Sequence, residues 1–159
     1  MSLKSIMIQK EDVISVTPDM TVKDALAKLV TSGVRSMPVI DSGGKYLGLF
    51  NFRALVGKLL PASACVEGGV ASLSFMAEDI AFIIDKFEQA KAMTVAEIMR
   101  TDVPAIHMDT VFEEALLQIY SSDAPLPVLE PETGTLVGLF SKQCAIAHFM
   151  ARASAGKGE

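Results

Sequence analysis

Residues 37–40 read Met-Pro-Val-Ile and residues 47–50 read Leu-Gly-Leu-Phe. Both stretches return about ninety positions later, where residues 126–129 read Leu-Pro-Val-Leu and residues 137–140 read Val-Gly-Leu-Phe. A duplicated unit buries its apolar face most readily against its own copy. The sequence therefore predicts one pseudo-symmetric body with a cleft between its halves, an architecture suited to binding.

The match extends ahead of these strands, since residues 16–26 align with residues 106–116. Each repeat reads strand, helix, strand, strand, helix. In the first repeat the pattern predicts a strand at 13–16, a helix that is capped by Thr21 and Asp24 and stopped by Gly33, and a second helix at 52–60.

In the second repeat, Thr110 and Glu113 are the predicted capping pair of the first helix. Its apolar stripe comprises Val111, Ala115, Leu116, Ile119 and Tyr120. Ser141 is expected to begin the last helix, which runs to about Arg152. The tail at 153–159 is small and polar and is expected to fray.

Residues 61–92 lie between the repeats and are predicted to be a loop followed by an amphipathic helix, helical from Leu73 to Met93. A capping pair at Thr94 and Glu97 then predicts a short helix before the second repeat. Two interpretations of the long helix stay open: it packs on its own domain, or it is a dimer or partner helix. The apolar residues that recur at heptad-like spacing along it are Met76, Ile80, Ile83, Phe87 and Ala90.

Composition excludes several classes of function. The chain has 159 residues, of which 50% are hydrophobic, and its net charge is −5 without any basic cluster, so we expect no nucleic-acid partner. No apolar run reaches the roughly 18 residues that would cross a bilayer, and no signal-peptide pattern begins the chain. Cys65 and Cys144 are far apart, which indicates ordinary thiols in a reducing cytoplasm. The apolar excess suggests an oligomer interface.

The sequence resembles the CBS domain family, named for cystathionine beta-synthase, and the whole chain resembles a tandem CBS pair, or Bateman module. The marks are the Thr-Val-x-Asp-Ala-Leu helix start, the Met-Pro-Val-Ile strand, the Gly-Leu-Phe return strand and the Ala-Glu-Ile-Met linker. The resemblance covers repeats at 5–60 and 93–152, and the insert at 61–92 lies outside it.

This resemblance implies an α+β fold of two β-α-β-β-α repeats that pack with pseudo-twofold symmetry, plus the inserted helix. It also implies clefts that in many relatives bind AMP, ATP or S-adenosylmethionine. Such modules usually regulate another protein and commonly form homodimers.

The family's ligand site is a return strand that ends in Gly-h-h-Thr/Ser-x-x-Asp, where h is apolar and the Asp accepts hydrogen bonds from both ribose hydroxyls. This chain departs from that pattern. Asn51 and Ala54 stand at the hydroxyl and Asp positions of the first repeat, and Ser141 and Cys144 stand there in the second. Neither repeat has the ribose carboxylate, whose two bonds contribute roughly 1.5–3 kcal/mol each.

The resemblance and the helix-start positions together give a set of candidate ligand-binding residues. Arg53, Ser141 and Lys142 lie at helix starts, where the N-terminus favours anions, and Arg35 lies in a loop that in relatives borders the cleft. These four residues are the candidate phosphate contacts. The competing interpretation is that the charges are solvated and that Asn51 and Ser141 are N-caps. The full set is Thr17, Arg35, Met37, Pro38, Asn51, Arg53, His107, Leu126, Pro127, Ser141 and Lys142.

No catalytic or metal-binding constellation stands out. His107 and His148 have no evident partner at metal-ligand spacing and are interpreted as structural, and no base is indicated beside Cys144. The sequence therefore predicts no enzyme but a cytoplasmic sensory module. A small anionic ligand would bind between the repeats, and an unidentified regulated protein would read the change. The alternative is an adaptor homodimer that has lost its ligand and uses the helix at 73–93 as its contact.

Overall fold

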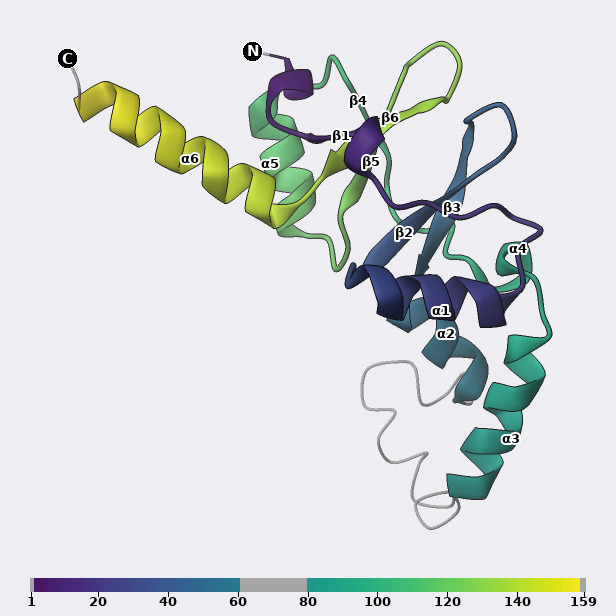
Figure 1. Ribbon diagram of the computed structural model, residues 1–159. Coiled ribbons are helices and arrows are strands. Elements are labelled where there is room, and N and C mark those ends of the chain that lie inside the picture. The colour runs from purple at the N-terminus through teal and green to yellow at the C-terminus, as the bar shows by residue number, and fades with distance from the viewer. Residues whose placement is uncertain (1, 61–79, 158–159) are drawn as a thin grey trace. The chain divides into compact units, whose positions relative to one another are not determined.

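The computed structural model describes residues 2–60 and 80–157 (Figure 1). The chain forms two compact units. Unit 1 comprises Met1–Ser15, Ile40–Leu47 and Asp102–Glu159, and unit 2 comprises Val16–Val39 and Gly48–Thr101. The predicted cleft between the repeats stays a prediction.

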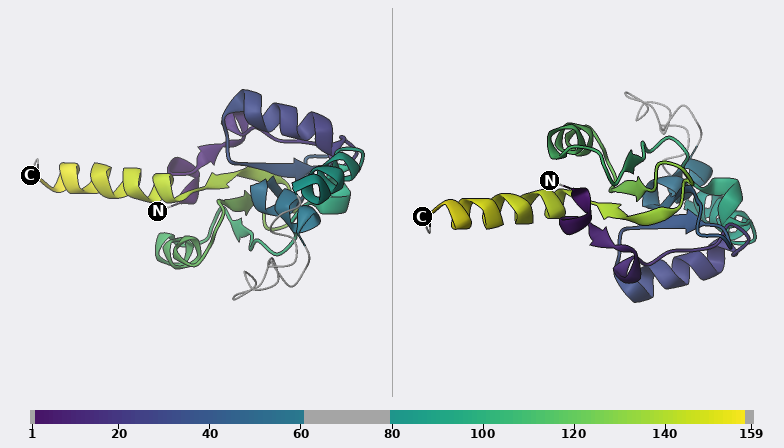
Figure 2. Two further views of the ribbon diagram at one scale, coloured as in Figure 1. Left: turned by 90° about the horizontal axis from the view of Figure 1, so that it is seen from below. Right: turned by 90° about the horizontal axis from the view of Figure 1, so that it is seen from above.

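Unit 1 is built on a four-stranded sheet in the order β1-β6-β5-β4. Strand β4 runs parallel to β5, while β6 is antiparallel to both β5 and β1. Helix α6 runs on beyond this sheet as a straight rod (Figure 2). The elements are η1 (Leu3–Ser5), β1 (Ile8–Gln9), η2 (Lys10–Asp12), β4 (Ile106–His107), α5 (Phe112–Tyr120), β5 (Leu126–Leu129), β6 (Leu136–Phe140) and α6 (Lys142–Lys157).

Unit 2 holds four helices among its described residues and most of a hairpin that is formed by two paired strands. The tip of this hairpin, Ile40–Leu47, belongs to unit 1. The elements are α1 (Val22–Ser32), β2 (Ser36–Ile40), β3 (Tyr46–Asn51), α2 (Phe52–Leu59), α3 (Ile80–Lys91) and α4 (Val95–Ile98).

The compact units cut across the sequence repeats because each repeat begins with a lead segment that pairs with the return strand of the other repeat. The first lead segment, residues 3–9, pairs Ile8 with Leu139 of β6 in unit 1. The second, residues 95–100, bonds Arg100 to Leu49 of β3 in unit 2 through two backbone hydrogen bonds of 2.8 Å. The predicted boundaries at 5–60 and 93–152 follow the repeats, whereas each unit combines one repeat with the other's lead segment.

Most of the predicted helix and turn signals are confirmed. The Thr21 hydroxyl accepts a hydrogen bond from the Asp24 N–H at 3.2 Å, and α1 ends at Gly33, whose φ of 74° is in the left-handed region that favours glycine. Before the second repeat, the Glu97 carboxylate accepts from the Thr94 N–H at 2.7 Å, as the predicted capping pair requires.

Two local predictions are wrong. The strand expected at 13–16 is reduced to a single parallel bridge between Val16 and Val39. The capping pair at Thr110 and Glu113 does not form, because the Thr110 hydroxyl instead accepts from the His107 N–H at 3.0 Å. Helix α5 therefore begins at Phe112 without a side-chain cap at Val111.

The helix ends also differ from expectation. The tail expected to fray continues α6 to Lys157, since its alanines are strong helix formers. In α5, Ala115 and Ile119 are buried as predicted, but Tyr120 is 83% exposed and Val111 is 57% exposed. The predicted stripe is thus only partly a core face.

Helix α3 forms within the predicted 73–93 segment and packs against α1 and α2 of its own unit. Ala90 is buried, and Phe87 and Ile83 are half-buried, which supports packing on its own domain for this part of the stripe. Ile80, Phe82 and Ile84 are exposed, so the partner-helix interpretation stays open. The predicted segment at 61–79, with Met76 and Cys65, lies outside the described residues.

Many of the core residues occupy positions that the repeat makes equivalent. Phe50 and Phe140, at matching positions of β3 and β6, are both fully buried. Burying a side chain of this size stabilises a fold by roughly 1.5–3 kcal/mol. In the described residues, 2–60 and 80–157, no helix combines the length and apolar character that crossing a membrane needs.

Candidate functional site

In unit 2 the candidate residues gather at one end of the β2–β3 hairpin. The Asn51 amide, at the end of β3, donates to the Ser36 hydroxyl at the start of β2 over 3.3 Å. This contact brings Arg35, which directly precedes Ser36, and Arg53, two residues after Asn51, to the same strand end. Both arginines are exposed, whereas Met37 and Pro38 are buried within β2.

The same arrangement recurs in unit 1. Leu126, at the start of β5, pairs with Phe140, at the end of β6. Ser141 and Lys142 follow directly, so four candidate residues, Leu126, Pro127, Ser141 and Lys142, share this strand end. Leu126 and Pro127 are buried, and Lys142 is exposed.

Two candidate residues lie elsewhere within their units. His107 pairs opposite Leu129 at the other end of β5, three residues from Leu126 and so about 10 Å along the strand. Thr17 follows Val16, which is bridged to Val39 near the far end of β2 from Ser36. Neither His107 nor Thr17 is brought to the strand end of its own unit.

Asn51 and Ser141 both act as N-caps, as one of the two interpretations expected. The Asn51 carbonyl oxygen accepts from the Ala54 N–H at 3.0 Å, and its amide nitrogen bonds Ser36, so both ends of this 7%-exposed side chain are engaged. The Ser141 hydroxyl accepts from the Cys144 N–H and donates to the Cys144 Sγ, each at 3.2 Å. A thiol is a weak acceptor, so the Ser141 hydroxyl can change to a stronger one.

Two hollows in the described part of unit 1 lie beside α6. One is an apolar groove of about 360 Å³ between α5 and α6, whose lining includes Leu116, Tyr120, Ile146 and Phe149. The other, of about 240 Å³, lies between the first lead segment and α6 and is lined by Met7, Cys144 and His148 among others. The four-residue spacing of Cys144 and His148 is a signal that sequence reasoning missed.

No metal site of the usual kind is present in the part of the chain that the structure describes. Residues 2–60 and 80–157 contain no group of three or more His, Cys, Asp or Glu side chains that could hold an ion.

The chain belongs to the CBS domain family, whose model matches residues 3–61 and 95–149. The two matches and the structural neighbours define the class as a tandem CBS pair with an α+β fold, which confirms the predicted fold class. CBS-pair proteins are typically regulatory. No curated relative matches the chain.

Several solved structures share this fold. A CBS domain-containing protein of unknown function from Bacillus anthracis is 22% identical, with a TM-score of 0.73 over 95% of this chain and 94% of that one. CBSX2 in complex with AMP is 18% identical, with a TM-score of 0.71 over 96% and 98%. CbpB in complex with c-di-AMP is 14% identical, with a TM-score of 0.70 over 99% and 90%. At such identities the likeness shows the fold alone.

Proposed function

We propose that the chain is a cytoplasmic regulatory CBS module that binds a small anionic, adenosine-containing ligand at the end of β6 and signals to a partner protein. The observation that carries this proposal is the weak hydrogen bond that the Ser141 hydroxyl donates. This hydroxyl is half-buried and donates only to a thiol among the contacts found, while the exposed Lys142 begins α6 beside it. A helix N-terminus with a hydroxyl and an ammonium group suits a phosphate.

The first repeat is the weaker candidate. Asn51 fills the equivalent position, but its amide bonds Ser36 and Ala54, so ligand binding would first have to break internal hydrogen bonds. The printed names of CBSX2 with AMP and CbpB with c-di-AMP support adenine nucleotides as the first ligands to test. ATP and S-adenosylmethionine belong to the same test.

Calorimetric titration with AMP, ATP, S-adenosylmethionine and c-di-AMP tests this function. We expect one nucleotide to bind and the Ser141→Ala variant to lose about tenfold in affinity, because a hydrogen bond to a charged group contributes about 1.5–3 kcal/mol. Ser141→Thr keeps the hydroxyl and the cap and should bind normally. The Lys142→Ala variant removes the proposed ammonium contact to the phosphate. Lys45→Ala is its charge control, because it removes the charge of an exposed lysine at the hairpin tip. If none of the four nucleotides binds, the sensory proposal is wrong.

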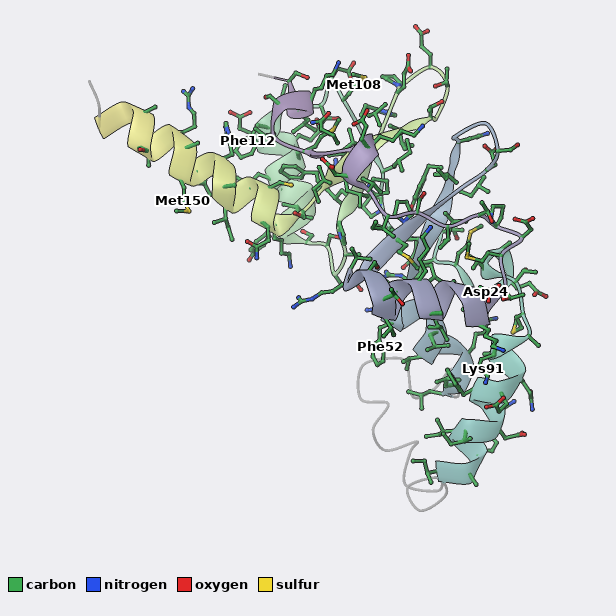
Figure 3. All side chains as sticks on the ribbon, viewed as in Figure 1. Asp24, Phe52, Lys91, Met108, Phe112 and Met150 are labelled. Carbon is green, nitrogen blue, oxygen red and sulfur yellow. The ribbon has the colours of Figure 1, made fainter. Side chains whose placement is uncertain are left out.

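The adaptor homodimer is a second candidate, here with a contact other than the helix at 73–93 that the sequence suggests, because unit 1 leaves apolar helix residues exposed among its described residues. Tyr120 is 83% exposed, Phe149 47% and Ile146 48%. Met150, at 69%, points outward from α6 (Figure 3). Tyr120, Ile146 and Phe149 line the groove between α5 and α6, which Lys142 also borders, and Met150 follows Phe149 on α6. An exposed apolar patch of this kind marks an interaction site in soluble proteins. We propose that a second copy covers it.

Sedimentation equilibrium tests the dimer. Phe149→Asp places a charge in this face and should weaken self-association by about tenfold or more, which corresponds to 1.4 kcal/mol. Ala147→Asp is the matched control, since two residues along a helix turn the side chain by about 200° and Ala147 is also exposed. Equal effects of the two variants, or a monomeric parent protein, would rule out this face as the dimer contact.

A further inference from the structure

The 240 Å³ pocket of unit 1 gathers three side chains that bind soft metal ions. Its lining combines the first lead segment with one face of α6. Met7 offers a thioether, Cys144 a thiol and His148 an imidazole. The remaining lining residues are Ser5, Ile6, Ala147 and Ala151, so no carboxylate faces the pocket.

The fold explains why the three donors meet. Cys144 and His148 are four residues apart on α6, and side chains at this spacing lie on one face of a helix. Met7 is 7% exposed and precedes Ile8, whose pairing with Leu139 holds the lead segment against β6. The donors therefore come from two elements whose positions the backbone fixes.

Two further contacts orient the α6 donors. The His148 ring lies against the Phe112 ring, with 4.8 Å between their centroids, and Figure 3 shows Phe112 beside the first half of α6. The Ser141 hydroxyl donates to the Cys144 Sγ at 3.2 Å. Hydrogen bonds of this kind to a ligand atom are the outer-shell support that metal sites use.

The donor set selects the kind of ion. Calcium and magnesium require oxygen ligands, which this pocket does not offer as carboxylates. Structural zinc sites use four ligands from Cys, His, Asp and Glu, and the described residues contain no group of even three. Thiolate and thioether sulfurs favour copper(I). We propose that Met7, Cys144 and His148 form a three-coordinate site for a soft monovalent cation, copper(I).

The chain offers matched controls for this site because it has two cysteines and two histidines in all. The experiment uses the full chain with Cys65→Ser as background, which leaves one thiol. Copper(I) is supplied anaerobically as its bicinchoninate complex, and transfer to the protein is followed by loss of the colour of that complex. We expect one equivalent to be bound.

Removal of either strong ligand should weaken binding by more than about 100-fold, since even outer-shell partners contribute about 10–100-fold to metal affinity. Cys144→Ser and His148→Gln carry this expectation. Met7→Leu should give a smaller loss and remove one sulfur neighbour from the X-ray absorption spectrum of the bound copper. His107→Gln should leave the affinity unchanged, and circular dichroism of each variant reports whether it is folded.

Three results would overturn the site: Cys144→Ser binds copper(I) as tightly as the background, His148→Gln and His107→Gln behave alike, or zinc(II) is retained as tightly as copper(I). This inference goes beyond the proposed nucleotide function and does not depend on it. Nucleotide binding and copper binding are measured with separate probes, so either can fail alone.

Discussion

Replacing Gly138 by alanine is expected to destabilise the protein by about 3 kcal/mol, at the upper end of what overpacking costs. A Cβ at this position of β6 would overlap the carbonyl oxygen of Ile8 and come within 2.9 Å of the Met7 Sδ. A flexible side chain can yield to an added methyl group, but Ile8 contributes a backbone atom that is held in the sheet. Urea unfolding, followed by circular dichroism, measures the loss.

The equivalent glycine of the first repeat should respond in the same way. A Cβ at Gly48 would lie 2.7 Å from the Arg100 carbonyl oxygen and 2.9 Å from the Met99 Sδ. Gly57→Ala is the control, because it lies in α2 with no atom within 4 Å of the added Cβ, and it should stabilise the protein by about 0.5–1 kcal/mol. A Gly138→Ala variant as stable as the parent would mean that the first lead segment does not lie on β6.

The sequence shows that Gly48 and Gly138 are equivalent, but it does not show why glycine is required there. Their equivalence is evident because the Gly-Leu-Phe pattern recurs. The need for glycine at position 138 cannot be predicted, because it depends on pairing between Ile8 and Leu139, which are 131 positions apart in the chain. Periodicity reports only which face of an element is buried, and a two-residue strand such as β1 is too short to carry a period.

Local chemistry was predictable where a side chain and its partner lie within one turn. Thr21, Gly33 and the Thr94–Glu97 pair behave as their residue types dictate. Thr110 does not form its predicted cap with Glu113, because its hydroxyl accepts a hydrogen bond from the His107 N–H instead of from the start of α5. The outcome of such a competition depends on the path of the chain, which the residue types do not give.

The candidate site could likewise be predicted from the sequence only in part. The sequence identifies Asn51 and Ser141 as equivalent strand-end residues, but only the contacts reveal that Asn51 is bonded at both ends of its amide while Ser141 donates to a thiol. Taken by itself, His148 indicates only a structural residue. Its spacing of four from Cys144 is present in the sequence, whereas Met7 joins the two only through the fold.

Replacing Cys144 by aspartate is expected to raise the affinity for AMP about 100-fold. In the CBS family an aspartate at this position accepts from both ribose hydroxyls, and two hydrogen bonds to a charged group contribute roughly 1.5–3 kcal/mol each. Cys144 is half-buried in the first turn of α6, where a carboxylate also suits the helix dipole and Ser141 already caps the N–H of residue 144. The variant should therefore fold.

The prediction requires that the gain in affinity come from hydrogen bonds to the ribose and not from the added negative charge. Calorimetry with AMP and with its 2′,3′-dideoxy analogue separates the two, because the analogue lacks both donors and should bind the Cys144→Asp variant no better than the parent. Gln143→Asp adds the same charge at an exposed neighbouring position and should give no gain. An equal gain with the dideoxy analogue would show that the aspartate does not reach a ribose, and the strand end of β6 could then not be the nucleotide site that we propose. The same variant loses the thiolate, so it should also lose copper(I), which places two unlike ligands under the control of residue 144.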